Sequence, residues 1–143
     1  MDYHQLFAIA AAGLDAQRLR LQAATLNLAN ADTVQSAQGG SGSWRPLRAV
    51  VRPALREGGF GGLFAAMATL PEARLEALNS VPRRVHEPTH PAADAEGFVT
   101  YPGIDTVTER LTMLSAARAY EANLATLSIG RSLVLKTLEI GGR

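Results

Sequence analysis

The sequence predicts a mainly α-helical fold, in which long N- and C-terminal helices pair as a coiled coil around a small β-rich hairpin insert. Both ends of the 143-residue chain carry apolar residues at helical spacing and lack proline, whereas all 7 prolines lie in the middle. We divide the chain into an N-terminal axial helix and joint (1–33), a β-rich or irregular insert (34–103) and a C-terminal axial helix (104–143). These parts form one structural unit.

The N-terminal region, from residue 3 to about 31, carries two apolar rows. One follows three/four spacing and consists of Ile9, Ala12, Ala16, Leu19, Ala23 and Leu26. The other recurs every seven residues and consists of Phe7, Leu14, Leu21 and Leu28. The step between the rows is about 200° around a helix, so they lie nearly opposite each other. The second row needs cover from another helix of this chain or from another chain, and periodicity favours neither.

The C-terminal region repeats the pattern over a greater length. Its apolar row has heptad spacing with a break at Arg131, and consists of Met113, Ala117, Tyr120, Leu124, Leu127, Val134 and Leu138. A helix of roughly 37 residues would be about 55 Å long, whereas a compact domain of this size has a radius of gyration of about 15 Å. We therefore expect an elongated molecule whose apolar helix surface serves assembly.

Strands are predicted in the middle insert. Val50 and Val51 indicate a strand between Pro46 and Pro53, and residues 83–87 indicate a second. Residues 97–101 alternate as a hairpin element does. Residues 63–78, which are rich in Ala, Leu and Met, are interpreted as a short helix or a mobile loop.

Composition limits the possible partners. The formal net charge of +1 provides no field to attract nucleic acid or an anionic membrane, and the absence of cysteine excludes disulfides and thiolate metal sites. Charged residues interrupt every long apolar run, so no membrane-spanning segment is expected. The N-terminus has no basic region before its apolar stretch, so no Sec-type signal is expected either.

Candidate chemical groups are few. His86 and His90 have the spacing of a helical metal pair, but Pro88 and Pro91 exclude a regular helix there, and we interpret both as loop histidines. Asp94 and Glu96 precede a glycine and are interpreted as turn-forming residues rather than as an acid/base pair. The sequence thus predicts no enzyme, no cofactor, no metal and no small-molecule substrate.

A basic stretch stands beside Trp44 and consists of Arg45, Arg48, Arg52 and Arg56. We favour a solvated strand face or intersubunit ion pairs over a phosphate-binding groove, because two prolines and one aromatic residue make a poor groove. Polar residues within the apolar rows, namely Asn27, Tyr120 and Asn123, either fix the register between helices or lie at the edge of the rows in water.

Three segments carry a resemblance to a known family. Residues 26–33 (LNLANADT) are similar to the N-L-A-N-A-D-T segment of flagellar rod and hook proteins. Residues 90–102 (HPAADAEGFVTYP) resemble a segment typical of the proximal rod members of that family. Residues 114–123 (LSAARAYEAN) and 134–138 (VLKTL) resemble the family's C-terminal signature. Gly103 stands where the family usually has asparagine, and we expect Asp105 or Thr106 to cap the last helix instead.

The resemblance implies a structural subunit of the proximal rod of the bacterial flagellar basal body, polymerising through its terminal helices into a torque-transmitting shaft. Implied partners are the chain itself, other rod proteins, and components of the basal body and export gate. The implied location is the rod that crosses the periplasm, reached through the flagellar type III apparatus. Alternatives are another rod or hook axial protein, or a helical adaptor that does not polymerise.

Two sets of site residues follow. The expected polymer interface consists of Phe7, Leu14, Leu21, Asn27, Leu28, Asn30, Met113, Tyr120, Asn123, Leu124, Leu127, Val134 and Leu138. The expected hairpin signature consists of His90, Pro91, Asp94, Gly97, Phe98 and Tyr101.

Overall fold

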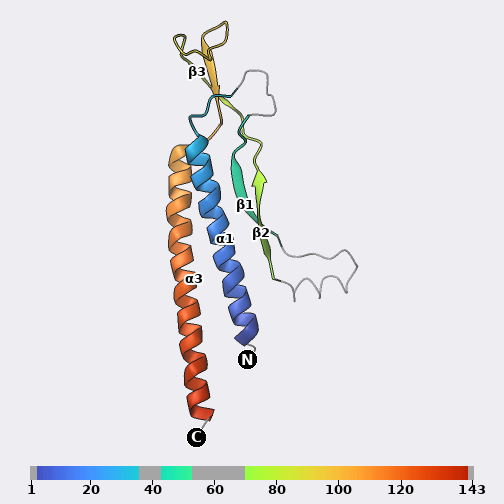
Figure 1. The fold of residues 1–143 in the computed structure, drawn as a ribbon, viewed down its shortest axis with the longest axis vertical. Coiled ribbons are helices and arrows are strands. Elements are labelled where there is room, and N and C mark those ends of the chain that lie inside the picture. Colours follow the sequence, from blue (N-terminus) through green and yellow to red (C-terminus); the bar gives the residue numbers. More distant parts are fainter. Residues whose placement is uncertain (1–2, 36–42, 53–69, 142–143) are drawn as a thin grey trace, which may run out of the picture.

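The computed structural model describes residues 3–35, 43–52 and 70–141. Two long helices, α1 (Tyr3–Asn30) and α3 (Thr106–Gly141), run antiparallel side by side, as Figure 1 shows. Between them in sequence come four strands: β1 (Leu47–Arg52), β2 (Glu72–Ala77), β3 (Arg83–His86) and β4 (Phe98–Tyr101). The molecule is elongated and mainly helical, with small antiparallel β-hairpins inserted between the helices, as the sequence predicts.

The strands form two separate antiparallel pairs. β1 pairs with β2 from Leu47 opposite Ala77 to Arg52 opposite Glu72, and β3 pairs with β4 from Arg83 opposite Tyr101 to His86 opposite Phe98. The β1–β2 pair lies along α1, on the side away from α3, and the β3–β4 pair projects beyond one end of the helices (Figure 1). The predicted strands between Pro46 and Pro53, at 83–87 and at 97–101 are confirmed by β1, β3 and β4.

The prediction of a helix or mobile loop over residues 63–78 is wrong where it can be compared with the structure. Residues 63–69 lie outside the described residues, but Glu72–Ala77 is strand β2. Ala73 and Leu75 alternate with more exposed charged residues and are half-buried. The helix-forming composition is overridden because pairing with β1 and packing on α1 bury the alternate side chains.

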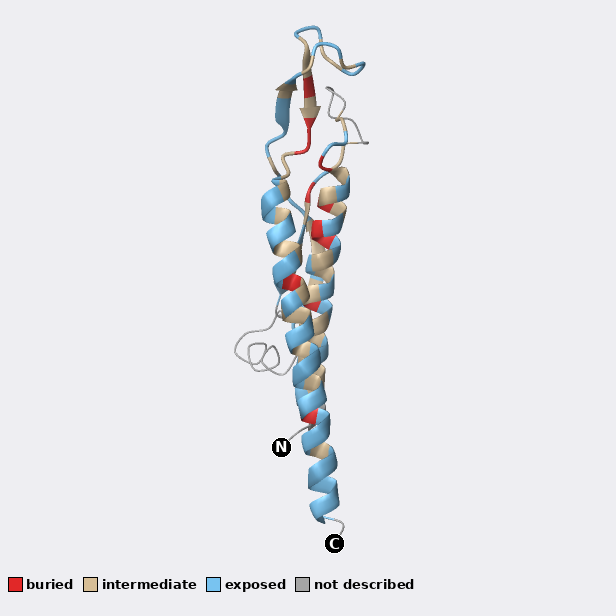
Figure 2. Cartoon of the chain, turned by 90° about the vertical axis from the view of Figure 1, so that its left-hand side faces the viewer, coloured by how far each residue is buried: buried red, intermediate tan, exposed pale blue. Residues whose placement is uncertain are grey.

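The core is narrow and is built largely from small residues. Its buried apolar members are Ala16, Ala23, Ala24, Ala31, Val99, Tyr101 and Ala116. Figure 2 shows the buried positions as isolated patches along the helices, with most of the helix surface exposed. Alanine lets the helices approach closely, but it buries little area per residue, so the fold leaves much apolar surface uncovered.

The two apolar rows of α1 are partly covered by other elements of the chain. α1 packs against α3 on one side and against β1 and β2 on the other. Leu14, Leu21 and Leu28 are each half-buried. Elements of this chain thus cover part of both rows, whereas Ile9 of the first row remains 55% exposed.

Candidate functional site

The contact between α1 and α3 depends on small residues that line up in antiparallel register. A side chain at Gly13 would begin 3.1 Å from the Asn123 amide, and one at Gly130 would begin 3.2 Å from Leu6. At the other end of the pair, the Thr25 hydroxyl lies 3.9 Å from the Met113 sulfur. These contacts place the N-terminal end of α1 beside residue 130 of α3.

The residues of α3 that are at least partly buried along this side recur in steps of four and three. They are Glu109, Met113, Ala116, Tyr120, Asn123, Leu127, Gly130 and Val134. Five of the expected interface positions lie on this α1-facing side: Met113, Tyr120, Asn123, Leu127 and Val134.

The other members of the predicted row do not face α1. Leu124 is 45% exposed and Leu138 is 67% exposed, whereas Ala116 and Gly130 are buried instead of Ala117 and Arg131. The prediction followed side-chain hydrophobicity, but close helix approach selects small residues. Every second position of the α1-facing row therefore lies one residue before the predicted one: Ala116, Asn123 and Gly130 take the places of Ala117, Leu124 and Arg131.

Asn27 joins three elements and is only 1% exposed. Its amide nitrogen donates to the Leu47 carbonyl at 2.8 Å and to the Glu109 carboxylate at 2.9 Å, while its amide oxygen accepts from the Leu47 N–H at 2.8 Å. The side chain therefore bonds the first residue of β1 much as a neighbouring strand would, and ties it to both helices. Of the two interpretations of Asn27, the position at the edge of the row in water is wrong, because the side chain is buried and bonded to β1 and α3.

The end of α1 is a defined joint. The Asn30 amide donates to the Leu26 carbonyl at 2.8 Å, and the Thr33 N–H donates to the Asn30 carbonyl at 3.1 Å. Ala31 is buried, so the chain turns out of the helix against the rest of the fold. Asparagine suits this place because its short amide can satisfy a terminal helix carbonyl.

The loop of the β3–β4 hairpin is organised by Asp94. Its carboxylate accepts from the N–H groups of Glu96 (3.0 Å) and Phe98 (2.8 Å) and pairs with Arg84 at 2.6 Å. The hydrogen bond from the Phe98 N–H, followed by those from Arg84 and Glu96, lowers the pKa of Asp94 below its usual value. The predicted turn-forming role of Asp94 is confirmed.

The rest of the hairpin signature lies around this loop. Gly97 has φ of 80°, and a side chain there would meet His86 and Pro88, both at 3.2 Å. Only glycine adopts this backbone conformation without strain. His86 packs edge-on against Phe98 with ring centroids 5.0 Å apart, and the His90 ring nitrogen accepts from the Ala92 N–H at 3.1 Å. Both histidines therefore act within the hairpin.

Tyr101 connects the base of the hairpin to the joint. Its hydroxyl donates to Glu87 at 3.1 Å, and burial followed by this carboxylate raises the pKa of the phenol. Arg83 lies over the Tyr101 ring and 3.8 Å from Asp32, the residue that follows α1 closely in sequence. The hairpin is thereby oriented relative to the helices.

Asp105 caps α3, which decides between the two predicted caps, Asp105 and Thr106. Its carboxylate accepts from the Val107 N–H at 3.0 Å and from the Thr108 hydroxyl at 2.5 Å. These bonds lower the pKa of Asp105. Gly103, just before it, is required because a side chain there would overlap the Val81 carbonyl oxygen.

The basic stretch is spread along a strand face. Arg52 pairs with Glu76 across the strands at 2.8 Å, Arg45 and Arg48 are exposed, and Arg56 lies outside the described residues. Within the described ranges, no group of three or more His, Cys, Asp or Glu side chains is placed to hold a metal ion. Neither of the two described helices is long and apolar enough to span a membrane.

Three contributors to the site escaped prediction from the sequence. No role was predicted for Glu109 or Gly13, and Arg84 was predicted only as part of the strand at 83–87. The signal for Gly13 was available, because a glycine inside a helix weakens it and calls for a packing reason. For Glu109 and Arg84 the partners are distant in sequence, and no local pattern identifies them.

These features define a class: an elongated structural protein whose helices present apolar surface at one end and a self-organised hairpin at the other. No family model matches the chain. It is 36% identical to the flagellar basal-body rod protein FlgC of Salmonella typhimurium over 95% of this chain and 96% of that protein. It is 33% identical to FlgC of Yersinia enterocolitica (99% of both chains) and 30% identical to FlgC of Bacillus subtilis (97% of both).

The chain belongs to the FlgC family of flagellar basal-body rod proteins. It is a structural protein of the flagellar basal-body rod and not an enzyme.

Proposed function

We propose that this chain polymerises through α1 and α3 to form part of the torque-transmitting shaft of the proximal rod. In this proposal the two helices pair as a coiled coil that joins those of neighbouring subunits. The partners are other copies of the chain, other rod proteins, and components of the basal body and the export gate.

One observation carries the proposal: α3 continues beyond the N-terminal end of α1, as Figure 1 shows. In this extension Leu138 is 67% and Ile140 is 77% exposed. Exposed apolar residues on a regular helix favour association, because covering each one stabilises the contact by roughly 1–2 kcal/mol. The part of α3 that extends beyond α1 has no described helix of its own chain beside it and is available to pack on another subunit.

The expected interface residues divide by what they contact. Asn27 and Asn30 bond within the chain, and in the proposal they hold the joint from which the helices enter the polymer. Phe7, Leu14, Leu21 and Leu28 are half-buried and keep an exposed edge. Leu124 and Leu138 are exposed and are assigned to contacts between subunits.

Deletion of residues 134–143 tests this function. We expect the truncated protein to be synthesised but to form no rod, so that a strain carrying it does not swim. Val81→Ser is the matched control, because Val81 is 87% exposed but lies at the hairpin end. Normal swimming by the truncated strain would contradict the proposal.

Location and export form the second part of the proposal. The subunit lies in the periplasm-spanning rod and leaves the cytoplasm through the flagellar type III apparatus with its N-terminus uncleaved. Mass spectrometry of the protein from purified basal bodies should find the N-terminal residues intact. Recovery of the protein only in the cytoplasmic fraction would instead support a non-polymerising adaptor.

A further inference from the structure

α3 carries a second row of residues on the side away from α1. The row, here called the outer row, advances in repeated steps of four, three and four residues, an 11-residue period that stays in line on a nearly straight helix. It consists of Val107, Leu111, Leu114, Arg118, Ala122, Ala125, Ile129, Leu133, Lys136 and Ile140. Eight of its ten members are apolar.

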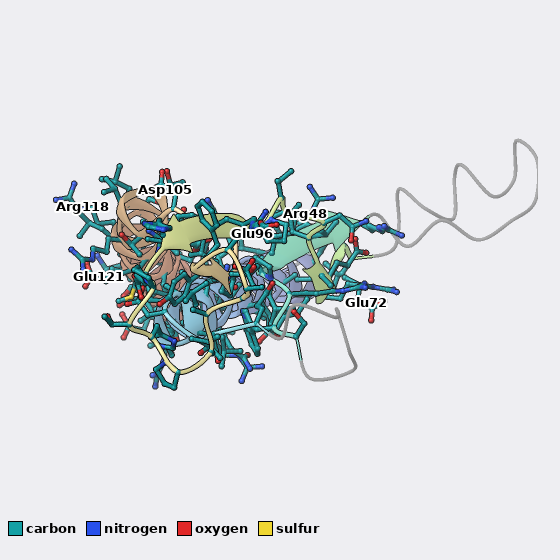
Figure 3. All side chains as sticks on the ribbon, turned by 90° about the horizontal axis from the view of Figure 1, so that it is seen from above. Arg48, Glu72, Glu96, Asp105, Arg118 and Glu121 are labelled. Carbon is teal, nitrogen blue, oxygen red and sulfur yellow. The ribbon has the colours of Figure 1, made fainter. Side chains whose placement is uncertain are left out.

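All members of the outer row are exposed. The large apolar ones range from 50% exposed at Leu114 to 77% at Ile140. Figure 3 shows Arg118 and the neighbouring Glu121 projecting from α3 away from β1 and β2. No described element of the chain therefore covers this row.

The two basic members of the outer row are matched by two acids beside it. Arg118 and Lys136 are eighteen residues apart, and Glu121 and Glu139 are also eighteen residues apart. Eighteen residues are five helical turns, about 27 Å, so each pair points in one direction. The acids lie about 60° around the helix from the bases. Among the described residues, none of the four forms an ion pair within the chain.

From this spacing we infer that the outer row packs against α3 of a second copy of this chain, parallel to it and displaced by three residues, about 4.5 Å. In that arrangement Arg118 lies opposite Glu121 of the second copy and Lys136 lies opposite Glu139. The inference rests on the proposed function and names the partner of the α3 surface.

The direction of the second copy follows from the charges and the polymer together. Subunits of a helical polymer share one direction along its axis, which selects the parallel arrangement. One copy then contributes its basic pair and the other its acidic pair. An antiparallel arrangement matches the same charges but closes into a two-fold dimer. The apolar members supply most of the affinity and the exposed ion pairs select the register.

Disulfide cross-linking tests the inference, since the chain has no cysteine of its own. Ala122→Cys and Ala125→Cys are expressed together as full-length chains in flagellated cells, and basal bodies are isolated and oxidised. The parallel register brings these positions level on helices about 8–10 Å apart, within disulfide range. We expect a 122–125 cross-linked dimer of this chain.

Three results would overturn the inference. Cross-linking of Ala125→Cys to Ser132→Cys, but not to Ala122→Cys, would indicate the antiparallel dimer. A disulfide-independent photocross-linker at Ala125 that captured only another rod protein would assign the row to that protein. Basal bodies that contain the chain without any 122–125 cross-link would refute this contact while leaving the proposed function intact; absence of the chain from basal bodies would refute the function itself.

Charge exchange tests the register separately. Arg118→Glu combined with Lys136→Glu should lower the yield of the 122–125 cross-link about tenfold, and adding Glu121→Arg and Glu139→Lys should restore it. The matched control is Arg20→Glu combined with Arg45→Glu, which changes the net charge equally at exposed positions away from the row. Failure of the fourfold variant to restore cross-linking would show that these charges do not set the register.

Discussion

α1 and α3 each carry apolar residues on two sides, but the fold treats the two helices differently. α1 lies between α3 and the β1–β2 pair, so elements of the chain cover part of both of its sides. Among the described helices and strands, α3 packs on α1 alone, and its outer row stays exposed. The difference indicates that α1 belongs to the interior of the subunit, whereas α3 carries the surface that remains for other subunits.

Substitution of Asn27 should cause the largest loss of stability, because this residue of α1 is bonded to both β1 and α3. Asn27→Leu would leave the Leu47 N–H and carbonyl and the Glu109 carboxylate without their partner, at a cost of about 3 kcal/mol. Chemical denaturation of the purified protein measures this loss. The exposed Asn79→Leu serves as control, and equal stability of the two variants would show that Asn27 does not hold the elements together.

A smaller loss is expected where α3 faces α1. Ala116 is fully buried, and Ala116→Leu should reduce the free energy of unfolding by about 2 kcal/mol because the larger side chain separates the helices. The comparison variant is Ala125→Leu on the outer row, which has room. If both variants unfolded at the same denaturant concentration, the two sides of α3 would not differ as described.

The pH dependence should be smaller and confined to acid. The pKa of Asp94 is lower in the folded chain than its ordinary value of 3.8, so its stabilising contribution is present above that pH and is lost as the pH falls. Asp94→Asn should therefore be less stable than the unmodified protein near neutrality, with the difference shrinking below about pH 3.8. A difference that stayed constant with pH would exclude this role.

Stability should change least on the outer row. Leu111→Ser combined with Leu114→Ser should alter the free energy of unfolding by less than about 0.5 kcal/mol for each substitution, because both side chains are exposed. The same variant should assemble poorly into basal bodies, as judged by immunoblotting of isolated rods. Normal assembly would place the intersubunit contact elsewhere.

The helices and most strands could be predicted from the sequence because their signals are local. Helical spacing, the placement of proline and the turn residues around Gly97 act within a few positions of each other. The cap at Asp105 and the joint at Asn30 are short-range for the same reason.

The features that could not be predicted from the sequence depend on contacts between segments that are far apart in the chain. β2 has a helix-forming composition and becomes a strand only through pairing with β1. The α1-facing row of α3 runs through Ala116 and Gly130 because of the space that α1 leaves, and a hydrophobicity pattern favours Leu124 instead. The hydrogen bonds of the Asn27 side chain reach Leu47 and Glu109, which are 20 and 82 positions away in the sequence. No local sequence pattern identifies such distant partners.

An electron-microscopy map of purified basal bodies that contain this chain tests the central claim most directly. We predict that the chain lies in the rod, that α1 is covered by its own α3 and β1–β2 pair, and that the outer row of α3 is covered by the α3 of a parallel neighbour. A map in which the chain is part of the rod but the outer row faces solvent would contradict the assignment of this surface to assembly.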